Sequence, residues 1–347
     1  MPVRRKRASM ADVAKLAGVS PQTVSRVSNG EPYVVDDKRQ RVFKAMKELG
    51  YRPNSAARAM KRGSFDTLGV VYYSLHDVGN YRSLEAISEA AAERGYATTL
   101  IPLQASTRRA TDGAFTKLGE MTVDAAIAII PSQFQDDAAL HLPQGIPLVV
   151  LGPRLWDEAS AVDFEQTSGV SDAMHHLIDL GHRHIDHISG PTDSYSAQAR
   201  RRIYEAVLSE SKLPAGRIWR GDWSPQSGYQ ACSALLDAVC EKRTDMPTAI
   251  FVANDQMALG AFRALLERGL RVPEDVSLIG FDNIDEAVEF PTPLTTVIQD
   301  WGKVGANAVD LAIEMLNGGA PTLRSVPTRL IVRQSTSEPG GHGRPRQ

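Results

Sequence analysis

From Thr67 onward, short apolar runs alternate with longer stretches whose apolar residues recur at helical spacing. Because fully buried strands read as continuous apolar runs, we predict parallel strands at TLGVVYY, TTLIPL, DAAIAII, PLVVLG, HIDHIS, TAIFVA and VSLIGF. Helices are predicted between them, at RSLEAISEAAAERGY, SGVSDAMHHLIDLGH, SGYQACSALLDAV and DQMALGAFRALLERG. Such alternation is typical of α/β proteins that carry helices on both faces of a parallel sheet.

The alternating region is too long for one core of ordinary size. It spans about 270 residues, whereas single domains commonly hold about 100–150, so we expect two α/β subdomains. Ligands of open α/β sheets bind outside the carboxyl ends of the strands. A cleft between the two subdomains is therefore the predicted ligand site.

The N-terminal segment carries the opposite charge from the rest of the chain. Residues 1–62 hold fifteen Lys and Arg against five Asp and Glu, a net charge of +10, whereas the remaining residues carry −12. A basic head on an acidic body indicates that the head meets a polyanion such as nucleic acid. A solvated basic tail without a partner is the alternative reading of the charge alone.

The N-terminal segment has the capping residues expected of two short helices joined by a tight turn. Ser9 is placed to cap the first helix, and Gly18 falls where a left-handed C-cap is needed. Ser20 then caps a second helix that has Pro21 at its first position. We predict a helix-turn-helix, followed by a third helix that Asp36 caps.

The second helix, PQTVSRVS, is rich in short polar side chains and has room for close approach to a surface. The first residues of a recognition helix meet base edges in the major groove. Gln22 suits adenine and Arg26 suits guanine, while Thr23 and Ser25 suit phosphates or thymine methyl groups. The helix is therefore predicted to read double-stranded DNA.

The sequence has neither the apolar span of a membrane protein nor the apolar h-region of a secretory signal peptide. No run of about 18 apolar residues occurs, and no apolar h-region follows the basic N-terminus. The chain has two cysteines, Cys232 and Cys240, which are expected to be free thiols in a reducing compartment. We predict a cytoplasmic protein without a membrane partner.

Catalytic and metal-binding signatures are also missing. The sequence has no GxGxxG, P-loop or GxSxG stretch, so we expect neither an enzyme nor a cofactor. Five of the eight histidines fall between His175 and His187. No cysteine or paired carboxylate joins them, so we expect no metal site there.

The stretches VSPQTVSRVSNG and MKELGYRPNSAARAMKRG resemble the DNA-binding head of the lactose-repressor (LacI/GalR) family, and the resemblance continues to about residue 335. It implies a helix-turn-helix domain followed by a two-subdomain body like the periplasmic sugar-binding proteins. The implied head is 1–51, the hinge helix and linker 52–66, the body 67–335 and a disordered tail 336–347. In the body, the N-subdomain would hold about 67–164 and 299–326, and the C-subdomain about 165–298 and 327–335.

The resemblance also assigns DNA contacts. In this family the hinge folds against its dimer mate, and an apolar side chain wedges into the minor groove. The family usually has Leu where this chain has Met60, whose unbranched side chain can fill the same role. The implied DNA-binding residues are Ser20, Pro21, Gln22, Thr23, Ser25, Arg26 and Asn29 in the head, and Asn54, Ala57, Arg58 and Met60 in the hinge.

In the body, the resemblance implies a sugar effector. Aromatic faces cover the apolar faces of sugar rings, and planar polar groups satisfy the hydroxyls. The implied effector-binding residues are Ser74, Arg200, Trp223, Asn254, Asp282 and Trp301. The chain departs from the family at Ile203, where Gly is usual, and each Trp could instead be an ordinary packed aromatic. The stretches GDWS, VANDQMALGA and TTVIQDW favour a galactoside-like effector.

The expected function is therefore a sugar-controlled transcriptional repressor that binds a near-palindromic operator as a homodimer. No apolar heptad repeat precedes the C-terminus, so a tetramer is not expected. Effector binding is expected to oppose DNA binding, with corepression as the other sign. A sugar-binding transport protein is the main alternative, and a sugar-processing enzyme is a third.

Overall fold

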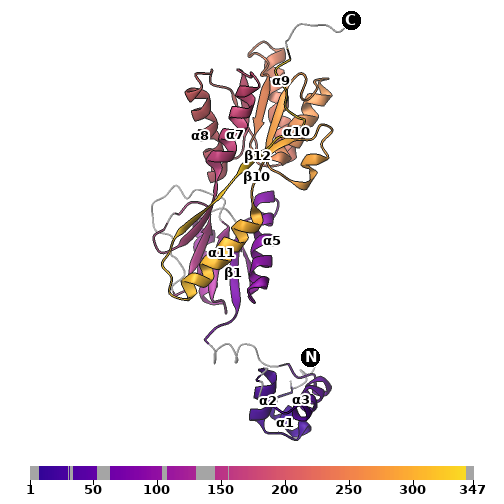
Figure 1. Ribbon diagram of the computed structural model, residues 1–347, viewed down its shortest axis with the longest axis vertical. Coiled ribbons are helices and arrows are strands. Elements are labelled where there is room, and N and C mark those ends of the chain that lie inside the picture. Colours follow the sequence, from indigo (N-terminus) through magenta and orange to yellow (C-terminus); the bar gives the residue numbers. More distant parts are fainter. Residues whose placement is uncertain are drawn as a thin grey trace. The chain divides into compact units, whose positions relative to one another are not determined.

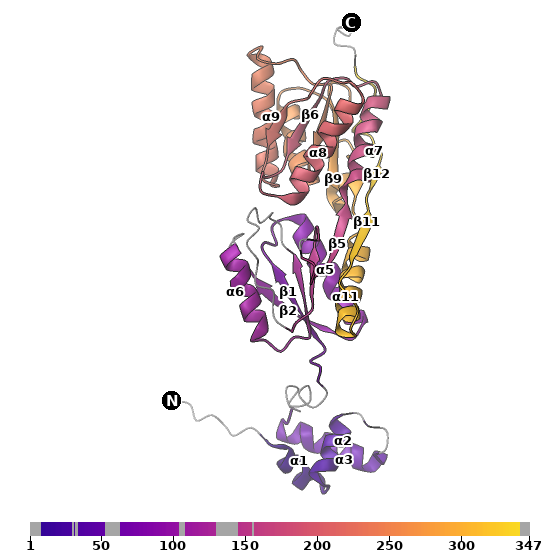
Figure 2. The same ribbon diagram turned by 90° about the vertical axis from the view of Figure 1, so that its left-hand side faces the viewer.

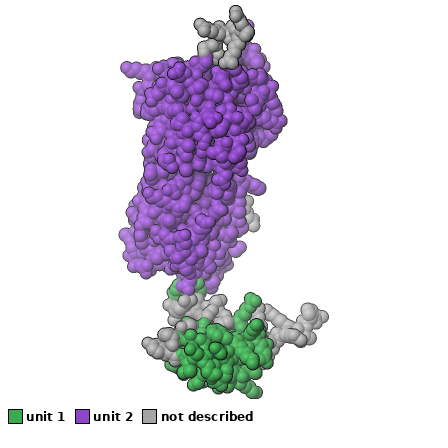
Figure 3. All heavy atoms as spheres, turned by 45° about the vertical axis from the view of Figure 1, so that its right-hand side comes forward, with its two compact units in different colours: residues 1–65 green, residues 66–347 purple. Residues whose placement is uncertain are grey.

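The computed structural model describes residues 8–29, 31, 34–52, 63–103, 108–129, 145–154 and 156–340. The chain divides into two compact units, Met1–Phe65 and Asp66–Gln347 (Figure 3). We call the first unit the head and the second the body, and describe each by itself.

The described part of the head contains α1 (Met10–Ala17), α2 (Pro21–Ser28) and α3 (Asp36–Leu49) around a small apolar core. Ser9 and Asp12 form a capping box at α1, and Gly18 adopts the left-handed conformation with φ 65°. Ser20 caps α2 by accepting a hydrogen bond from the Thr23 backbone. The predicted helix-turn-helix is confirmed.

The third helix of the head begins differently from the prediction. Asp36 is the first helical residue rather than the cap. Val35 occupies the cap position, and no side chain satisfies the free backbone N–H groups there. Asp36 and Asp37 still place negative charge in the first turn, where it is favourable for the helix dipole.

The described strands of the body form two six-stranded sheets (Figure 1). The first sheet has the order β11-β5-β4-β3-β1-β2 and the second β12-β10-β9-β8-β6-β7. The first contains β1 (Thr67–Tyr72), β2 (Ala97–Pro102), β3 (Ala125–Ile129), β4 (Leu148–Leu151), β5 (Ser160–Glu165) and β11 (Leu323–Pro327). The second contains β6 (Ile185–Ser189), β7 (Ile218–Arg220), β8 (Ala249–Val252), β9 (Ser277–Asp282), β10 (Thr295–Ile298) and β12 (Arg329–Ile331).

Helices cover both faces of each sheet, as the alternation predicts. On the first sheet, α5 (Val78–Glu93) and α11 (Trp301–Leu316) share one core, and α6 (Arg108–Gly119) belongs to the core on the other face. On the second sheet, α9 (Pro225–Cys240) and α10 (Asp255–Glu267) pack on one face, and α7 (Gln166–Asp179) and α8 (Tyr195–Glu210) on the other. We refer to these two assemblies as the first-sheet half and the second-sheet half.

All seven predicted strands are present, but the sequence prediction missed five others, namely β5, β7, β10, β11 and β12. It also missed α6, α8 and α11. The expectation of full burial is wrong for β2, which lies at the edge of its sheet and is largely exposed. The sheets are parallel except at the edge of the second, where β12 pairs antiparallel with β10.

Three crossover segments carry the chain between the halves: residues 165–166, residues 299–300 and Thr328. The Thr328 hydroxyl donates to the Glu165 carbonyl oxygen at 2.7 Å and accepts from the Gly169 backbone N–H at 3.1 Å. A Cβ at Gly169 would lie 2.5 Å from that hydroxyl oxygen and 2.4 Å from a Val297 methyl group. Figure 2 shows β5 and β11 side by side, with α7 and β12 continuing beyond them.

The C-terminal segment is more ordered than expected. Thr336 contacts His176 through a 2.9 Å hydrogen bond, and the Ser337 backbone donates to the Ser277 hydroxyl at 3.0 Å. The prediction of disorder from residue 336 is therefore wrong for these two residues, and residues 341–347 lie outside the described part. Among the described residues, no helix is both long and apolar enough to cross a bilayer.

Candidate DNA-binding and effector sites

Helix α2 has one face buried in the core of the head and a polar face that is exposed. Val24 and Val27 are buried in the head core, whereas Pro21, Gln22, Arg26 and Asn29 are exposed. Thr23 and Ser25 are half-buried. The exposed amide and guanidinium groups are those that the sequence assigns to base reading, and they are available to a partner.

Two hydroxyls of the proposed DNA surface are already used within the helix. The Ser20 hydroxyl accepts from the Thr23 backbone at 3.2 Å and hydrogen-bonds the Thr23 hydroxyl at 2.9 Å. These contacts fix the start of α2. Asn54, Ala57, Arg58 and Met60 of the predicted hinge lie outside the described residues.

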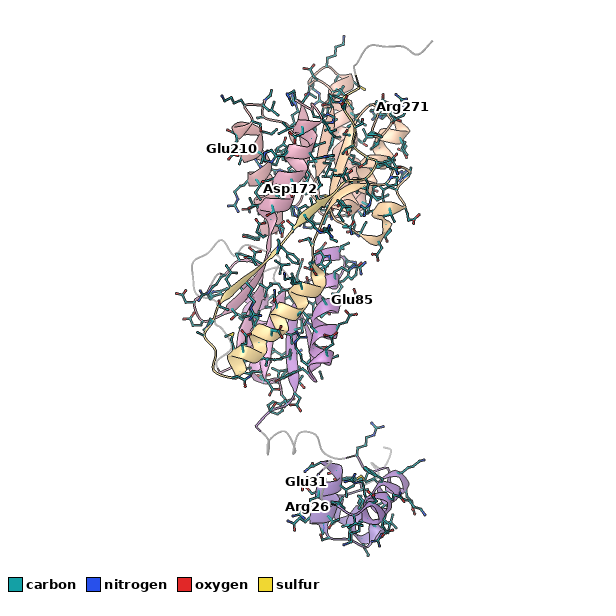
Figure 4. All side chains as sticks on the ribbon, in the orientation of Figure 1. Arg26, Glu31, Glu85, Asp172, Glu210 and Arg271 are labelled. Carbon is teal, nitrogen blue, oxygen red and sulfur yellow. The ribbon has the colours of Figure 1, made fainter. Side chains whose placement is uncertain are left out.

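Arg26 has an intramolecular partner that the sequence reading missed. Its Nε lies 3.6 Å from a Glu31 carboxylate oxygen, and both side chains are about half exposed (Figure 4). Glu31 lies five residues after Arg26, just beyond the end of α2, so proximity in sequence was a usable signal. A guanidinium that engages a guanine has to leave this carboxylate or share it.

Replacing Glu31 by Gln is expected to raise DNA affinity about two- to fivefold at low salt. The change frees Arg26 from an exposed ion pair, which is worth about 0.2–1 kcal/mol. Fluorescence anisotropy with a labelled duplex measures the affinity. Glu48→Gln makes the same charge change elsewhere on the head, and an equal gain in both variants would contradict the competition with Arg26.

In the body, Arg200 lies inward on α8 and is only 4% exposed. Its Nε donates to Gln166 Oε1 at 2.9 Å, and its terminal nitrogens contact the Ala253 carbonyl oxygen and Asp282. The guanidinium carbon lies 3.5 Å from the centre of the Phe281 ring. Burial lowers the pKa of Arg200 to about 10, against the opposing effect of Asp282, so the side chain stays charged at neutral pH.

Asp282 ends β9 and faces Arg200 across 3.6 Å. Its Oδ1 accepts from Gln299 Nε2 at 2.6 Å, which uses one carboxylate oxygen and leaves the other for a ligand. Burial raises the pKa of Asp282 to about 6, although Arg200 and Gln299 act in the other direction. Its φ of 108° lies in a region that few non-glycine residues adopt. Such backbone strain is typical of ligand sites.

Asn254 is placed at the site but is largely committed to structure. Its Oδ1 accepts from the Met257 backbone at 2.9 Å and so caps α10. Its Nδ2 donates to the Trp223 carbonyl oxygen at 3.1 Å. The amide therefore keeps one N–H for a ligand hydroxyl, and it holds the Trp223 backbone in place.

Trp223 lies beside Arg200 and Asn254 in the second-sheet half. Its ring lies 5.7 Å from the Arg200 guanidinium and rests on Gly190, where a Cβ would approach the ring to 2.5 Å. Trp223 itself has φ 77°. Trp223, Asn254 and Asp282 follow or end strands of the second sheet, and Arg200 lies on the helix after β6. The structure brings these four predicted residues together.

Ser74 and Trp301 belong to the first-sheet half and make no described hydrogen bond or ring contact with those four residues. The Ser74 hydroxyl accepts from the His76 backbone at 3.1 Å. Trp301 packs edge-to-face on Phe164, with ring centres 4.7 Å apart. These contacts show that Trp301 is packed on one side, and its predicted contact with a ligand stays a prediction.

Two carboxylates of the first-sheet half that the sequence prediction missed interact with groups of the second-sheet half. Burial raises the pKa of Asp163 to about 6, against a hydrogen bond that it accepts from the Tyr195 hydroxyl at 3.3 Å. Burial also raises the pKa of Asp77, with His76 opposing and Asp222 of the other half adding to the effect. No sequence signal marks these residues, because each depends on how the halves face one another.

Asp255 is a further buried carboxylate at the carboxyl edge of the second sheet, where its hydrogen bonds join neighbouring segments. Asp255 accepts from the Thr296 hydroxyl at 2.7 Å and from the Ile284 backbone at 3.0 Å. Burial and the nearby Asp282 raise its pKa to about 8. A Cβ at Gly280 would lie 2.0 Å from the Asp255 carboxylate, so this close approach requires glycine.

The histidine-rich stretch does not form a metal site among the described residues, where no group of three or more His, Cys, Asp or Glu side chains converges. His187 lies on β6, stacked between the Tyr204 and Phe251 rings, with its Nδ1 on the Phe251 carbonyl oxygen at 2.8 Å. Burial lowers its pKa to about 4. It is therefore a neutral core histidine at physiological pH.

Both the head and the body match known protein families. The family described as bacterial regulatory proteins, lacI family, matches residues 9–54, and the periplasmic binding protein-like domain matches residues 174–336. The lactose operon repressor of Escherichia coli (strain K12) is 32% identical over 336 residues, which cover 96% of this chain and 92% of that protein. The HTH-type transcriptional repressor PurR of Haemophilus influenzae (strain PittEE) is 32% identical over 314 residues, which cover 89% and 91%.

Solved structures of related regulators are similar in fold. The lac repressor dimer bound to operator and the anti-inducer ONPF superimposes with a TM-score of 0.86 at 33% identity, covering 96% of this chain and all of that one. The complex of the transcriptional regulator CelR with cellobiose gives 0.70 at 29% identity, covering 95% of this chain and all of that one. The relatives are transcriptional repressors rather than enzymes. The chain belongs to the LacI family and is a DNA-binding transcriptional repressor.

Proposed function

We propose that a small sugar controls the operator affinity of this repressor by binding between the halves of its body, and that galactosides are the effector class. The observation that carries the proposal is the convergence of Arg200, Trp223, Asn254 and Asp282 at the carboxyl edge of the second sheet. A buried charge pair beside an indole suits a ligand with hydroxyls on its rim and an apolar ring face.

The DNA side of the proposal assigns base reading to Gln22 and Arg26 and sequence-independent affinity to the basic head. A homodimer would place two α2 helices in successive major grooves of a near-palindromic operator. The site of action would be the bacterial cytoplasm, where such an operator lies. Effector and operator then share one coupling free energy and oppose each other, so we expect induction.

A titration of the full chain tests the effector class directly. All four tryptophans, Trp156, Trp219, Trp223 and Trp301, lie in the body, so tryptophan fluorescence reports on it alone. The panel is led by galactosides and includes cellobiose and ribose, which related regulators hold in their structures. A saturable change with galactosides supports the proposal, and saturation with another sugar class alone overturns the galactoside assignment.

Replacing Arg26 by Ala is expected to weaken binding to a selected operator about tenfold or more, because a bidentate contact to guanine is worth about 1–3 kcal/mol. Binding to random-sequence DNA should fall far less. The operator is first obtained by selection from a random duplex pool with the full chain, and both affinities are measured at one salt concentration. Equal losses on the two DNAs would remove the base-reading role.

A further inference from the structure

Gln166 lies between a proposed effector residue and the first crossover segment. It is the first residue of α7 and is buried. Its Oε1 accepts from Arg200 Nε at 2.9 Å, and its Nε2 donates to the Phe164 carbonyl oxygen at 3.3 Å. The two ends of one amide therefore tie α8 of the second-sheet half to the end of β5 in the first.

Contacts continue from Phe164 into the first-sheet half. The Phe164 ring meets Trp301 edge-to-face at 4.7 Å, at the start of α11. The Trp301 ring in turn rests against Gly79 of α5, where a Cβ would lie 3.4 Å from it. A continuous series of packed groups thus runs from Arg200 to the two helices on one face of the first sheet.

A second contact joins the same helix to the same strand. Tyr195, at the start of α8, donates its hydroxyl hydrogen bond to Asp163 on β5 at 3.3 Å. Helix α8 is therefore attached to this crossover at two points. Since a buried amide that loses its partner is unfavourable, Gln166 has to follow any displacement of Arg200.

We propose that Gln166 is a positioning residue that couples ligand contact at Arg200 to the first-sheet half, through Phe164 and Trp301. The proposal deepens the proposed function and rests on it, since it concerns the same effector site. It gives Trp301 the task of transmission in place of direct sugar contact.

The four tryptophans make the coupling measurable in the full chain labelled with 5-fluorotryptophan. In ¹⁹F NMR, Trp223 reports on Arg200 and Trp301 reports on Phe164. Trp219 donates to Asp186, and Trp156 packs in the core shared with α6, so both serve as folding controls. Each resonance is assigned with a Trp→Phe variant.

Arg200→Lys keeps the charge but loses the Nε contact, so it is expected to shift both the Trp223 and the Trp301 resonance. Gln166→Leu is expected to shift Trp301 by a similar amount. Because both changes break one link, the double variant should shift Trp301 no further than either single change. Additive shifts, or a Trp301 resonance that ignores Arg200→Lys, would overturn the proposal.

Two further variants keep the test decisive. Gln198→Leu alters a half-buried amide on the same helix, which donates to the Thr192 carbonyl oxygen, and should move neither resonance. Loss of the native Trp156 and Trp219 resonances in Arg200→Lys would show that this variant does not fold. In that case Gln166→Glu is used for the test instead. A carboxylate still accepts from Arg200 but cannot donate to Phe164, so Trp301 should move while Trp223 stays, and an unmoved Trp301 contradicts the proposal.

Sugar titration separates this proposal from the proposed function. A sugar that shifts Trp223 should also shift Trp301 in the native chain, and only Trp223 in Gln166→Leu. A panel that leaves Trp223 unmoved counts against a sugar effector, while the variant shifts still decide the role of Gln166.

Discussion

Replacing Gly260 by Ala is expected to lower the free energy of unfolding by about 3 kcal/mol. A Cβ at this position would lie 1.9 Å from the Pro225 carbonyl oxygen, because helices α9 and α10 are in close backbone contact there. Backbone cannot yield as a side-chain end can, so the helices have to separate, and overpacking of this kind costs about 1–3 kcal/mol or more. Urea unfolding followed by circular dichroism measures the change.

Gly113→Ala is the matched control, since it makes the same substitution in helix α6. Among the described residues, no atom outside the neighbouring turns of the helix backbone lies within 4 Å of a Cβ there, so the variant should be more stable by about 0.5–1 kcal/mol through helix propensity alone. Gly260→Ala should also weaken effector binding, because Trp223 precedes α9 and Asn254 caps α10. Equal stability of the two variants would show that the helices can separate without penalty.

Asp255→Asn is expected to make the body more stable at pH 8 and to flatten the dependence of its stability on pH. The folded-state pKa of about 8 lies well above that of an unfolded aspartate, so the folded state holds a proton that the unfolded state has released. Stability attributable to Asp255 is therefore complete below about pH 4 and is lost as pH rises to about 8, by up to about 5 kcal/mol.

An amide fits the position because the Thr296 hydroxyl can turn to accept from it, while the amide oxygen still accepts from the Ile284 backbone. Thermal unfolding between pH 5 and pH 8.5 gives both profiles. Asp245→Asn, at an exposed aspartate, should reproduce the native profile. A variant that keeps the native slope would show that Asp255 is ionised in the folded protein.

Local signals in the sequence predicted the parts of the fold that local physics determines. Ser9, Gly18, Ser20 and Pro21 predicted the helix-turn-helix, because caps act within a few residues of where they stand. Buried strands such as β8 were visible as apolar runs. Strand β5 was not, since its sequence, SAVDFE, places two carboxylates in a strand that leads out of the sheet toward a crossover.

The proposed effector site was predictable only in part. Asn254 and Asp282 follow apolar strands, which is a readable signal, but the capping role of Asn254 competes with ligand binding for the same atoms. Gln166 and Gln299 were missed because their roles depend on crossover segments that bring distant parts of the chain together. Tertiary packing of this kind has no period or local composition to reveal it.

Because the chain crosses between the halves three times, neither sheet can be completed until nearly the whole chain has been synthesised. The first sheet is completed by β11 and the second by β12, and both strands lie near the C-terminal end of the chain. The described helices of the head, by contrast, leave the ribosome first and share one small apolar core. A nascent or truncated chain therefore contains its whole helix-turn-helix before either sheet of the body can be completed.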